Sequence, residues 1–346
     1  MFAHEFGNKS RYLEMLGQLD VMHETHLSNS SQAAFGTRDG VKCALWCNNP
    51  HISAGSFDTQ TATELNHFLE FCLEHDVETI ILFIDSAGVS LKDPQSGMAG
   101  VAQSIKQIHR LNIRQGCKTV SILGETRGCF GGALLIAGAC QYQIAHPDAL
   151  IGVSGPQVIE SITGVPRQEY MTVYSADYRL STGEISHLLT EQNLLNRVSA
   201  LPPRQLDLSF LYSLINILEG KRVCNQRPSG FENKPISLAD LKEAAAGLLH
   251  SRAHMLNLKG NAEQPFSFEN ERNGFSLYLK ALAATLRYRV ETGLQVNINV
   301  TSQGSGATFI AFSMMGSQLN IAPEAKVRAL PQVAVERIVQ TRPFIQ

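Results

Sequence analysis

Long apolar runs, basic patches and paired cysteines are all missing from this sequence of 346 residues. No stretch reaches the ~18 apolar residues that a membrane-spanning helix needs, and residues 1–16 lack the apolar core of a signal peptide. Lysine and arginine number 29 against 31 aspartates and glutamates, and no basic stripe is interleaved with aromatic residues, so nucleic-acid binding is not expected. The seven cysteines are an odd, scattered set, typical of reduced thiols. We therefore expect a cytoplasmic protein with neither membrane nor nucleic acid as a partner.

Metal and nucleophile signatures are also scarce. Cys43 and Cys47 are four residues apart, but no second pair accompanies them, so neither a zinc site nor any other metal is expected. No Ser-His-Asp set and no paired carboxylates stand out. The hydrophobic fraction of 44% and the charged fraction of 17% are ordinary for a globular enzyme, and the length allows two modest domains.

The most informative stretch is residues 121–160. An apolar strand runs into a glycine cluster, and a helix of small residues begins at about residue 132. Residues 79–91, TIILFIDSAGVSL, repeat the arrangement upstream, because a buried strand ends in DSAGV just before another helix. With helices expected over 61–75 and 95–111, strands and helices alternate, which predicts an α/β fold with mainly parallel strands.

These two turns suggest a chemistry. A helix that begins at glycine presents free backbone N–H groups at its positive end, and glycine lets an anion or oxyanion approach them closely. A tight turn that needs glycine only for packing would give the same pattern. Because the turns follow neighbouring strands, we predict that they lie side by side, with Gly88 and Val89 in the first and Gly131 and Gly132 in the second.

The segments DSAGV, RGCFGGALLIAG and HPDALIGVSGPQVIE resemble the carboxyltransferase branch of the crotonase-like superfamily, and most closely the β subunit of biotin-independent malonate decarboxylase. Later segments, NGFSLYLKAL, GSGATFIAFSMMG and APEAKVRALPQVAVERI, resemble the γ subunit of that enzyme. The resemblance implies two crotonase-like (ββα-superhelix) halves in one chain, the second truncated. The implied domains are a β-like N-type domain over 1–221, a polar linker over 222–236 and a γ-like C-type domain over 237–346.

The resemblance implies decarboxylation of a malonyl thioester, carried on the phosphopantetheine of an acyl carrier protein or on CoA. The acetyl thioester would form through an enolate and would supply acyl units to fatty-acid or polyketide synthesis. Two alternatives stay open: the carboxyltransferase component of a biotin-dependent acyl-CoA carboxylase, and a non-catalytic scaffold subunit. No biotin-attachment motif of the Met-Lys-Met type is present, so under the carboxyltransferase alternative biotin would come from a separate protein. For the decarboxylase, biotin is not expected as a cofactor. A homodimer is expected, with each site shared between the N-half of one chain and the C-half of another.

The four turn residues are the expected catalytic donors. The resemblance further implies substrate contacts from Ser86, Ala87, Phe130, Ser154, Gln157, Gly306 and Ala307. In the second half, Ala307 and Thr308 stand where the γ subunit has a glycine pair, which would make close approach to the N–H groups harder. Asp85 is expected to orient its turn and Cys129 to serve in packing, while His109 is expected at a helix end, in a capping or surface role.

Elsewhere, hydrophobic periodicity predicts further elements. Helices are expected over 9–23, 156–174, 181–195, 208–218, 237–250 and 274–290, strands over 41–46, 253–258 and 294–300, and a polar loop over 259–273.

Overall fold

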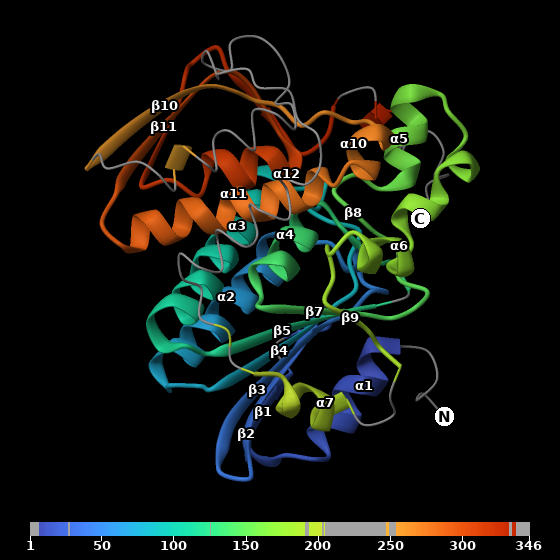
Figure 1. Cartoon of the computed structure of the whole chain (residues 1–346), viewed down its shortest axis with the longest axis vertical. Coiled ribbons are helices and arrows are strands. Elements are labelled where there is room, and N and C mark those ends of the chain that lie inside the picture. Colours follow the sequence, from blue (N-terminus) through green and yellow to red (C-terminus); the bar gives the residue numbers. More distant parts are fainter. Residues whose placement is uncertain are drawn as a thin grey trace.

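The computed structural model describes residues 7–26, 28–124, 126–190, 194–202, 204, 247–248, 254–331 and 334–336. Its main sheet has seven strands in the order β1-β2-β3-β4-β5-β7-β9 (Figure 1). These strands are β1 (Asp20–His26), β2 (Ser31–Arg38), β3 (Val41–Asn48), β4 (Thr79–Ile84), β5 (Lys118–Leu123), β7 (Tyr142–Ala145) and β9 (His187–Leu188). The first two pairings are antiparallel and the remaining four are parallel, which agrees with the predicted mainly parallel α/β fold.

Helices cover both faces of this sheet. One face carries α2 (Thr59–Glu74), α3 (Pro94–Arg110) and α4 (Gly131–Ala139), and the other carries α1 (Gly7–Leu16) and α7 (Leu194–Ala200) (Figure 1). Strand β4 is buried along its whole length because successive side chains enter the two cores in turn. Ile80 and Leu82 pack with α2, α3 and α4, whereas Ile81 and Phe83 pack with α1 and α7.

A second, smaller sheet forms the C-terminal half. Strand β11 (Gln295–Ser305) pairs in parallel with β10 (Met255–Ala262), β12 (Gln318–Ile321) and β13 (Lys326–Arg328). Its helices are α10 (Phe268–Arg272), α11 (Phe275–Glu291) and the short α12 (Gly306–Thr308), which continues as a π-helical turn, η5 (Phe309–Ser313).

The two halves pack on one another through α11 and α4 (Figure 1). Gly138 of α4 makes this close approach possible, since a Cβ there would lie 2.5 Å from the aliphatic carbons of Lys280 on α11. Side chains of both halves belong to one hydrophobic core. The fold is therefore that of two α/β halves, the second of them shortened.

The N-terminal segment departs from the prediction of a helix over 9–23. Helix α1 ends at Leu16, and the chain then enters a hairpin of β1 and β2 at the edge of the sheet. Gly36 is the reason that β1 fits there, because a Cβ at this position would lie 2.6 Å from the carbonyl oxygen of Asp20. This close backbone approach is a tertiary feature, so the helical periodicity of residues 9–23 did not reveal it.

The helices predicted over 156–174 and 181–195 are also wrong in extent. Helix α5 (Pro156–Thr163) ends at Gly164, which adopts a left-handed conformation with φ of 73°. Two 3₁₀ turns, η3 (Arg167–Glu169) and η4 (Met171–Tyr174), and the helix α6 (Ala176–Ser181) follow. Residues 187–188 form β9, because the edge of the main sheet offers β7 as a pairing partner.

In the second half, the strand predicted over 253–258 begins at Met255 and extends to Ala262, and the loop predicted over 259–273 contains α10. The remaining short elements are η1 (Ser53–Gly55), the π-helical turn η2 (Leu111–Gln115), and a parallel pair of β6 (Cys129–Phe130) with β8 (Ile151–Gly152). The linker predicted over 222–236 and the helix predicted over 208–218 lie outside the described residues, as does all but 247–248 of the helix predicted over 237–250. Among the described residues, none of the helices combines the length and the hydropathy of a membrane-spanning segment.

Candidate active site

The turn after β4 is held in place by Asp85. Its buried carboxylate accepts backbone N–H hydrogen bonds from Thr126 (3.0 Å), Arg127 (2.5 Å) and Gly128 (3.0 Å). Burial raises the pKa of the Asp85 carboxyl, and these N–H groups oppose the rise. Gly124 gives the carboxylate room, since a Cβ there would lie 2.5 Å from Asp85 Oδ2. Asp85 therefore ties the first turn to the second, as its predicted orienting role requires.

The two glycine turns lie side by side, as predicted. The backbone N–H of Ser86 donates to the carbonyl of Gly128 (2.7 Å), and the N–H of Phe130 donates back to the carbonyl of Ser86 (3.1 Å). Gly88 has φ of 111° and Gly131 has φ of 55°, conformations that favour glycine. A Cβ built at Gly131 would lie only 3.9 Å from the Cα of Gly88. The turns after β4 and β5 thus bring together two glycines with positive φ.

Both glycine turns carry backbone N–H groups, but those of the second turn are free of a protein acceptor in α4 whereas that of Gly88 is already hydrogen-bonded. Gly131 and Gly132 are the first two residues of α4, where N–H groups have no carbonyl partner within the helix. The preceding residue, Phe130, makes no side-chain cap hydrogen bond. The N–H of Gly88, in contrast, donates to Ser86 Oγ at 3.1 Å. A substrate oxygen at Gly88 would therefore have to displace the Ser86 hydroxyl.

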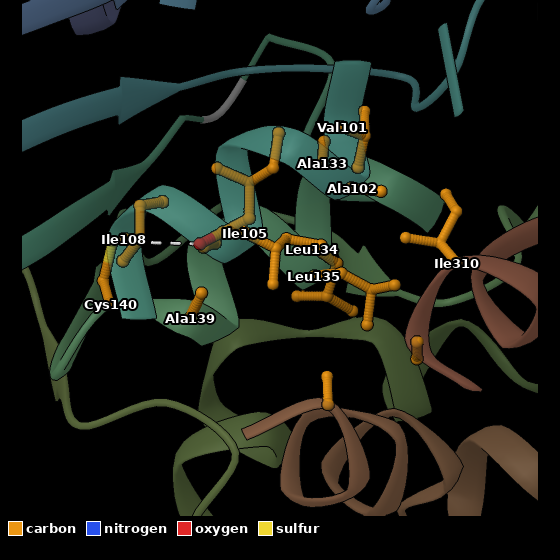
Figure 2. Close-up of a cluster of buried hydrophobic side chains, with 14 of the residues drawn as sticks. Val101, Ala102, Ile105, Ile108, Ala133, Leu134, Leu135, Ala139, Cys140 and Ile310 are labelled. Carbon is orange, nitrogen blue, oxygen red and sulfur yellow. Dashed lines mark hydrogen bonds between the residues drawn. The ribbon is translucent and has the colours of Figure 1, made fainter. Parts of the chain in front are cut away.

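Gly132 also has a packing role. A Cβ at this position would lie 2.9 Å from Val89 Cγ2, 3.2 Å from Val101 Cγ1 and 3.4 Å from Ile310 Cδ1. Figure 2 shows Ile310 of the C-terminal half beside the helices that carry Val101 and Ala133. The alternative reading of the glycine pair, close packing, thus holds for Gly132, whereas Gly131 faces the adjoining turn.

The C-terminal half contains a turn of the same form. Its helix begins at Gly306, with φ of 56° against 55° at Gly131. By their place at the start of the helix, Gly306 and Ala307 correspond to Gly131 and Gly132. The N–H of Ala307 donates to Oε1 of Gln264 at 2.7 Å. In this structure, a side chain of the same chain occupies the donor of the second turn.

The remaining predicted substrate contacts lie in different surroundings. Ser154 is buried, and its Oγ accepts from Gln264 Nε2 at 2.6 Å. Phe130 is buried against Tyr174, with ring centroids 6.3 Å apart. Ala87 is exposed beside Gly88, and Gln157 is exposed on α5. The structure thus brings Ser154 and Ala307 together through Gln264, and it places Gln157 at the surface.

A buried cluster of four charged side chains joins the halves behind Ser154. Arg179 forms ion pairs with Glu184 (2.6 Å) and Glu271 (2.8 Å), and Lys280 lies 3.5 Å from Glu184. Glu271 also accepts the backbone N–H of Ser154 at 2.7 Å. Burial alone would raise the pKa of Glu184, but Arg179 and Lys280 outweigh it and hold that pKa at about 2. The two positive and two negative charges balance, so no buried charge is left unpaired. The cluster holds the backbone of Ser154 in place through Glu271.

Sequence reasoning missed Gln264 and this cluster. Glu271 and Gln264 fell within the predicted loop over 259–273, and Glu184 fell within the predicted helix over 181–195. The partners are distant in sequence: Arg179 and Glu271 are separated by 92 residues. No local pattern signals such a contact.

Cys129 and His109 are both buried, and burial shifts the pKa of each. Cys129 is fully buried, and burial raises the pKa of its thiol, so it remains a neutral packing residue as predicted. His109, expected in a capping or surface role, is instead buried between the halves, with only 2% exposed. Burial, with Arg287 nearby, lowers the pKa of His109 to about 3. Among the described residues, no group of histidine, cysteine, aspartate and glutamate could hold a metal ion.

The chain is similar to known proteins that are named as carboxyl transferases. The chain is 26% identical over 168 residues to the acetyl-coenzyme A carboxylase carboxyl transferase subunit beta of Alkaliphilus oremlandii strain OhILAs, which covers 48% of this chain and 58% of that protein. It is 28% identical over 117 residues to the malonyl-S-ACP:biotin-protein carboxyltransferase MADC of Malonomonas rubra, covering 34% of this chain and 36% of that protein. The chain thus spans from about a third to a little over half of the length of these two relatives.

A solved structure and a family profile agree with these relatives. The crystal structure of the Pseudomonas malonate decarboxylase MdcD-MdcE hetero-dimer is similar with a TM-score of 0.50 and 25% identity, over 58% of this chain and 90% of that chain. The profile of the carboxyl transferase domain matches residues 4–192, more than half of the 346 residues. The matched region includes β4, β5, both N-terminal glycine turns and Ser154. This chain therefore belongs to the carboxyl transferase domain family, in the crotonase-like carboxyltransferase branch.

Proposed function

We propose that this chain decarboxylates a malonyl thioester to the corresponding acetyl thioester. The observation that carries the proposal is the close approach of the turns of Gly88 and Gly131, which follow two neighbouring parallel strands: the Cβ position of Gly131 lies 3.9 Å from the Cα of Gly88. Backbone N–H groups at such a point are aimed before the reaction starts, which is what stabilisation of a developing oxyanion requires.

The reaction breaks the bond between the malonyl carboxylate and the α-carbon. The carboxylate leaves as CO₂, and the electron pair of the broken bond forms an enolate whose negative charge lies on the thioester oxygen. N–H groups of Gly131 and Gly132, together with Gly88 or Val89, would hold the two reacting oxygens. Removing one such donor costs about 10²–10³ in rate in other enzymes. A proton from solvent on the α-carbon completes the acetyl group, so no strong base is required.

We further propose that the substrate arrives on the phosphopantetheine arm of an acyl carrier protein or of CoA, and that biotin takes no part. The buried thiol of Cys129 is protonated at neutral pH, which agrees with a route that needs no thiolate. Arg127, exposed beside the second turn, has its Nε bonded to the carbonyl of Pro50 (3.1 Å). Its guanidinium is a candidate partner for a substrate carboxylate or a phosphate.

The second candidate is the carboxyltransferase component of a biotin-dependent acyl-CoA carboxylase, which moves a carboxyl group between biotin and an acyl thioester. The names of both curated relatives support carboxyl transfer, and the name of MADC also specifies a biotin protein. Such a transfer must stabilise two oxygens in turn, the enolate oxygen and the ureido oxygen of biotin. The bond from Ala307 N–H to Gln264 counts against it, because that donor is already used. The third candidate is a non-catalytic scaffold. The close packing around Gly132 supports it, because packing alone would then explain the glycine.

A homodimer remains part of the proposal. Within one chain, however, the halves already meet at the hydrogen bond between Gln264 and Ser154, so this contact does not require an exchange of halves between chains. Sedimentation that finds a fully active monomer would remove the dimer from the proposal.

The test is to incubate the purified protein with malonyl-CoA and with malonyl-acyl carrier protein, with and without free biotin, in D₂O. Decarboxylation predicts CO₂ release and deuterium in the acetyl methyl group in the absence of biotin. Carboxylation of biotin with no turnover in its absence would establish the second candidate instead. A folded protein that turns over neither thioester under either condition would leave the scaffold.

A further inference from the structure

The side chain of Gln264 lies where the second glycine turn would hold an anion. It is 3% exposed, and its Oε1 accepts the N–H of Ala307 at 2.7 Å. A Cβ on Gly306 would lie 2.3 Å from the same oxygen, so the open face of this glycine is already covered. The backbone N–H of Gln264 donates to Ser305 Oγ at 2.9 Å, which holds the residue from its other side.

These contacts determine the orientation of the amide. A backbone N–H can only donate, so the Gln264 atom facing Ala307 must be the oxygen, and the other terminal atom is the NH₂ group. An amide NH₂ can only donate, so Ser154 Oγ must accept the 2.6 Å hydrogen bond from Gln264 Nε2. The Ser154 hydroxyl therefore keeps its own hydrogen for another acceptor.

Ser154 is held from two directions by the C-terminal half. Glu271 accepts its backbone N–H at 2.7 Å, and Gln264 donates to its Oγ. No acceptor for the Ser154 hydroxyl hydrogen is found in the described part of the chain. The residue is 3% exposed, so a hydroxyl hydrogen without an acceptor would be costly unless a bound molecule or water supplied one.

Ser154 is also close to the N-terminal turn. It directly follows Val153, whose carbonyl oxygen lies 3.7 Å from the position of a Cβ on Gly131. The backbone that carries Ser154 therefore passes close to the pair of glycines with positive φ.

We propose that Gln264 is a positioning residue that aims the Ser154 hydroxyl at an oxygen of the malonyl thioester. In this arrangement the turn at Gly306 and Ala307 anchors Gln264 instead of holding substrate, and the C-terminal half acts through Ser154. The inference rests on the proposed decarboxylation, because it assigns a third donor to that reaction. It makes Ser154 a catalytic residue and gives the second turn a positioning role.

The test converts the donor of Gln264 into an acceptor. In Gln264→Glu, a carboxylate can still accept from Ala307, but it accepts from Ser154 as well and turns that hydroxyl away from the substrate. We expect kcat for malonyl-CoA at high pH to fall at least about tenfold, the size of one lost hydrogen bond, with little change in KM. Burial and the nearby Glu271 carboxylate should raise the pKa of the new carboxyl, with Arg179 beyond Glu271 opposing the rise. As pH falls through that pKa, the protonated carboxyl can donate to Ser154 again, so kcat should recover.

Three variants complete the series. Gln264→Met and Ser154→Ala should lose a similar factor at every pH, because neither can regain the donor. Gln141→Glu is the matched control, since Gln141 is also buried and donates through Nε2 to the carbonyl of Cys117 (3.0 Å) away from the turns; its kcat should show no such pH-dependent recovery.

The outcomes separate the inference from the proposed function. A folded Gln264→Glu variant with wild-type kcat at all pH values, or with a loss that does not recover at low pH, would overturn the positioning role. A wild-type protein that releases no CO₂ from malonyl thioesters would overturn the proposed decarboxylation and this role with it. Recovery confined to Gln264→Glu supports both.

Discussion

The substitution Gly131→Ala tests the oxyanion assignment directly. Gly131 has φ of 55°, and a methyl group there would lie 3.7 Å from the carbonyl oxygen of Val153 and 3.9 Å from the Cα of Gly88. Both distances are ordinary van der Waals contacts, so the methyl group fits, but it occupies the space between the two turns. Gly132 is a poorer choice, because a Cβ at that position would collide with Val89 and would test packing instead.

The substitution has two expected effects, a loss of folding stability and a loss of turnover, and a control variant separates them. An L-residue in the left-handed region costs about 1–2 kcal/mol, and this loss of folding free energy is expected wherever the conformation is kept. Gly116→Ala is the matched control: Gly116 has φ of 63°, and nothing lies within 4 Å of its Cβ position. Both variants should therefore lose about 1–2 kcal/mol of stability. Only Gly131→Ala should lose turnover, by at least ~10²-fold, if the methyl group keeps the substrate oxygen from its donors.

The assay is turnover of malonyl-CoA by both variants, with urea unfolding to measure stability. Equal stability losses with a turnover loss confined to Gly131→Ala would support the assignment. If a folded Gly131→Ala protein turns over malonyl-CoA as fast as Gly116→Ala, the reasoning is refuted, and the glycines are packing residues.

Three further predictions follow from buried groups. Cys129→Ala should keep most of the activity, because the thiol is buried and neutral; a turnover loss beyond about 10³-fold would make it a participant. Arg179→Met should lower the free energy of urea unfolding by about 3–5 kcal/mol, because it leaves Glu184 and Glu271 buried without their shared partner, and an unchanged unfolding midpoint would contradict this. In the folded protein the pKa of His109 is about 3, against an ordinary 6.5, so between these pH values protons bind preferentially to the unfolded chain. The free energy of unfolding should therefore fall as pH drops from about 6.5 to 3. His109→Gln should reduce the dependence of this free energy on pH, and a dependence equal to that of the wild type would argue against a buried neutral imidazole.

Local sequence patterns carried much of the fold. Strand β4 could be predicted because an unbroken apolar run bounded by polar residues is typical of a central parallel strand. Helices α2 and α3 could be predicted because their apolar residues recur at helical spacing, and each begins after an aspartate that accepts an N–H of its first turn. The hairpin of β1 and β2 could not, since it depends on the backbone contact that Gly36 permits.

The candidate site divides along the same line. The positions of the glycine turns could be predicted from the sequence, because glycine between a strand and a helix is a local requirement for positive φ and close approach. Three contacts could not be predicted in this way: Gly132 packs close to Ile310, Arg179 pairs with Glu271, and Gln264 accepts the N–H of Ala307. Each of these contacts joins residues more than 40 positions apart, where the chain leaves no periodicity to read. The physical reason is that a turn records its own backbone geometry, whereas the partner of a buried polar group depends on which distant surface packs against it.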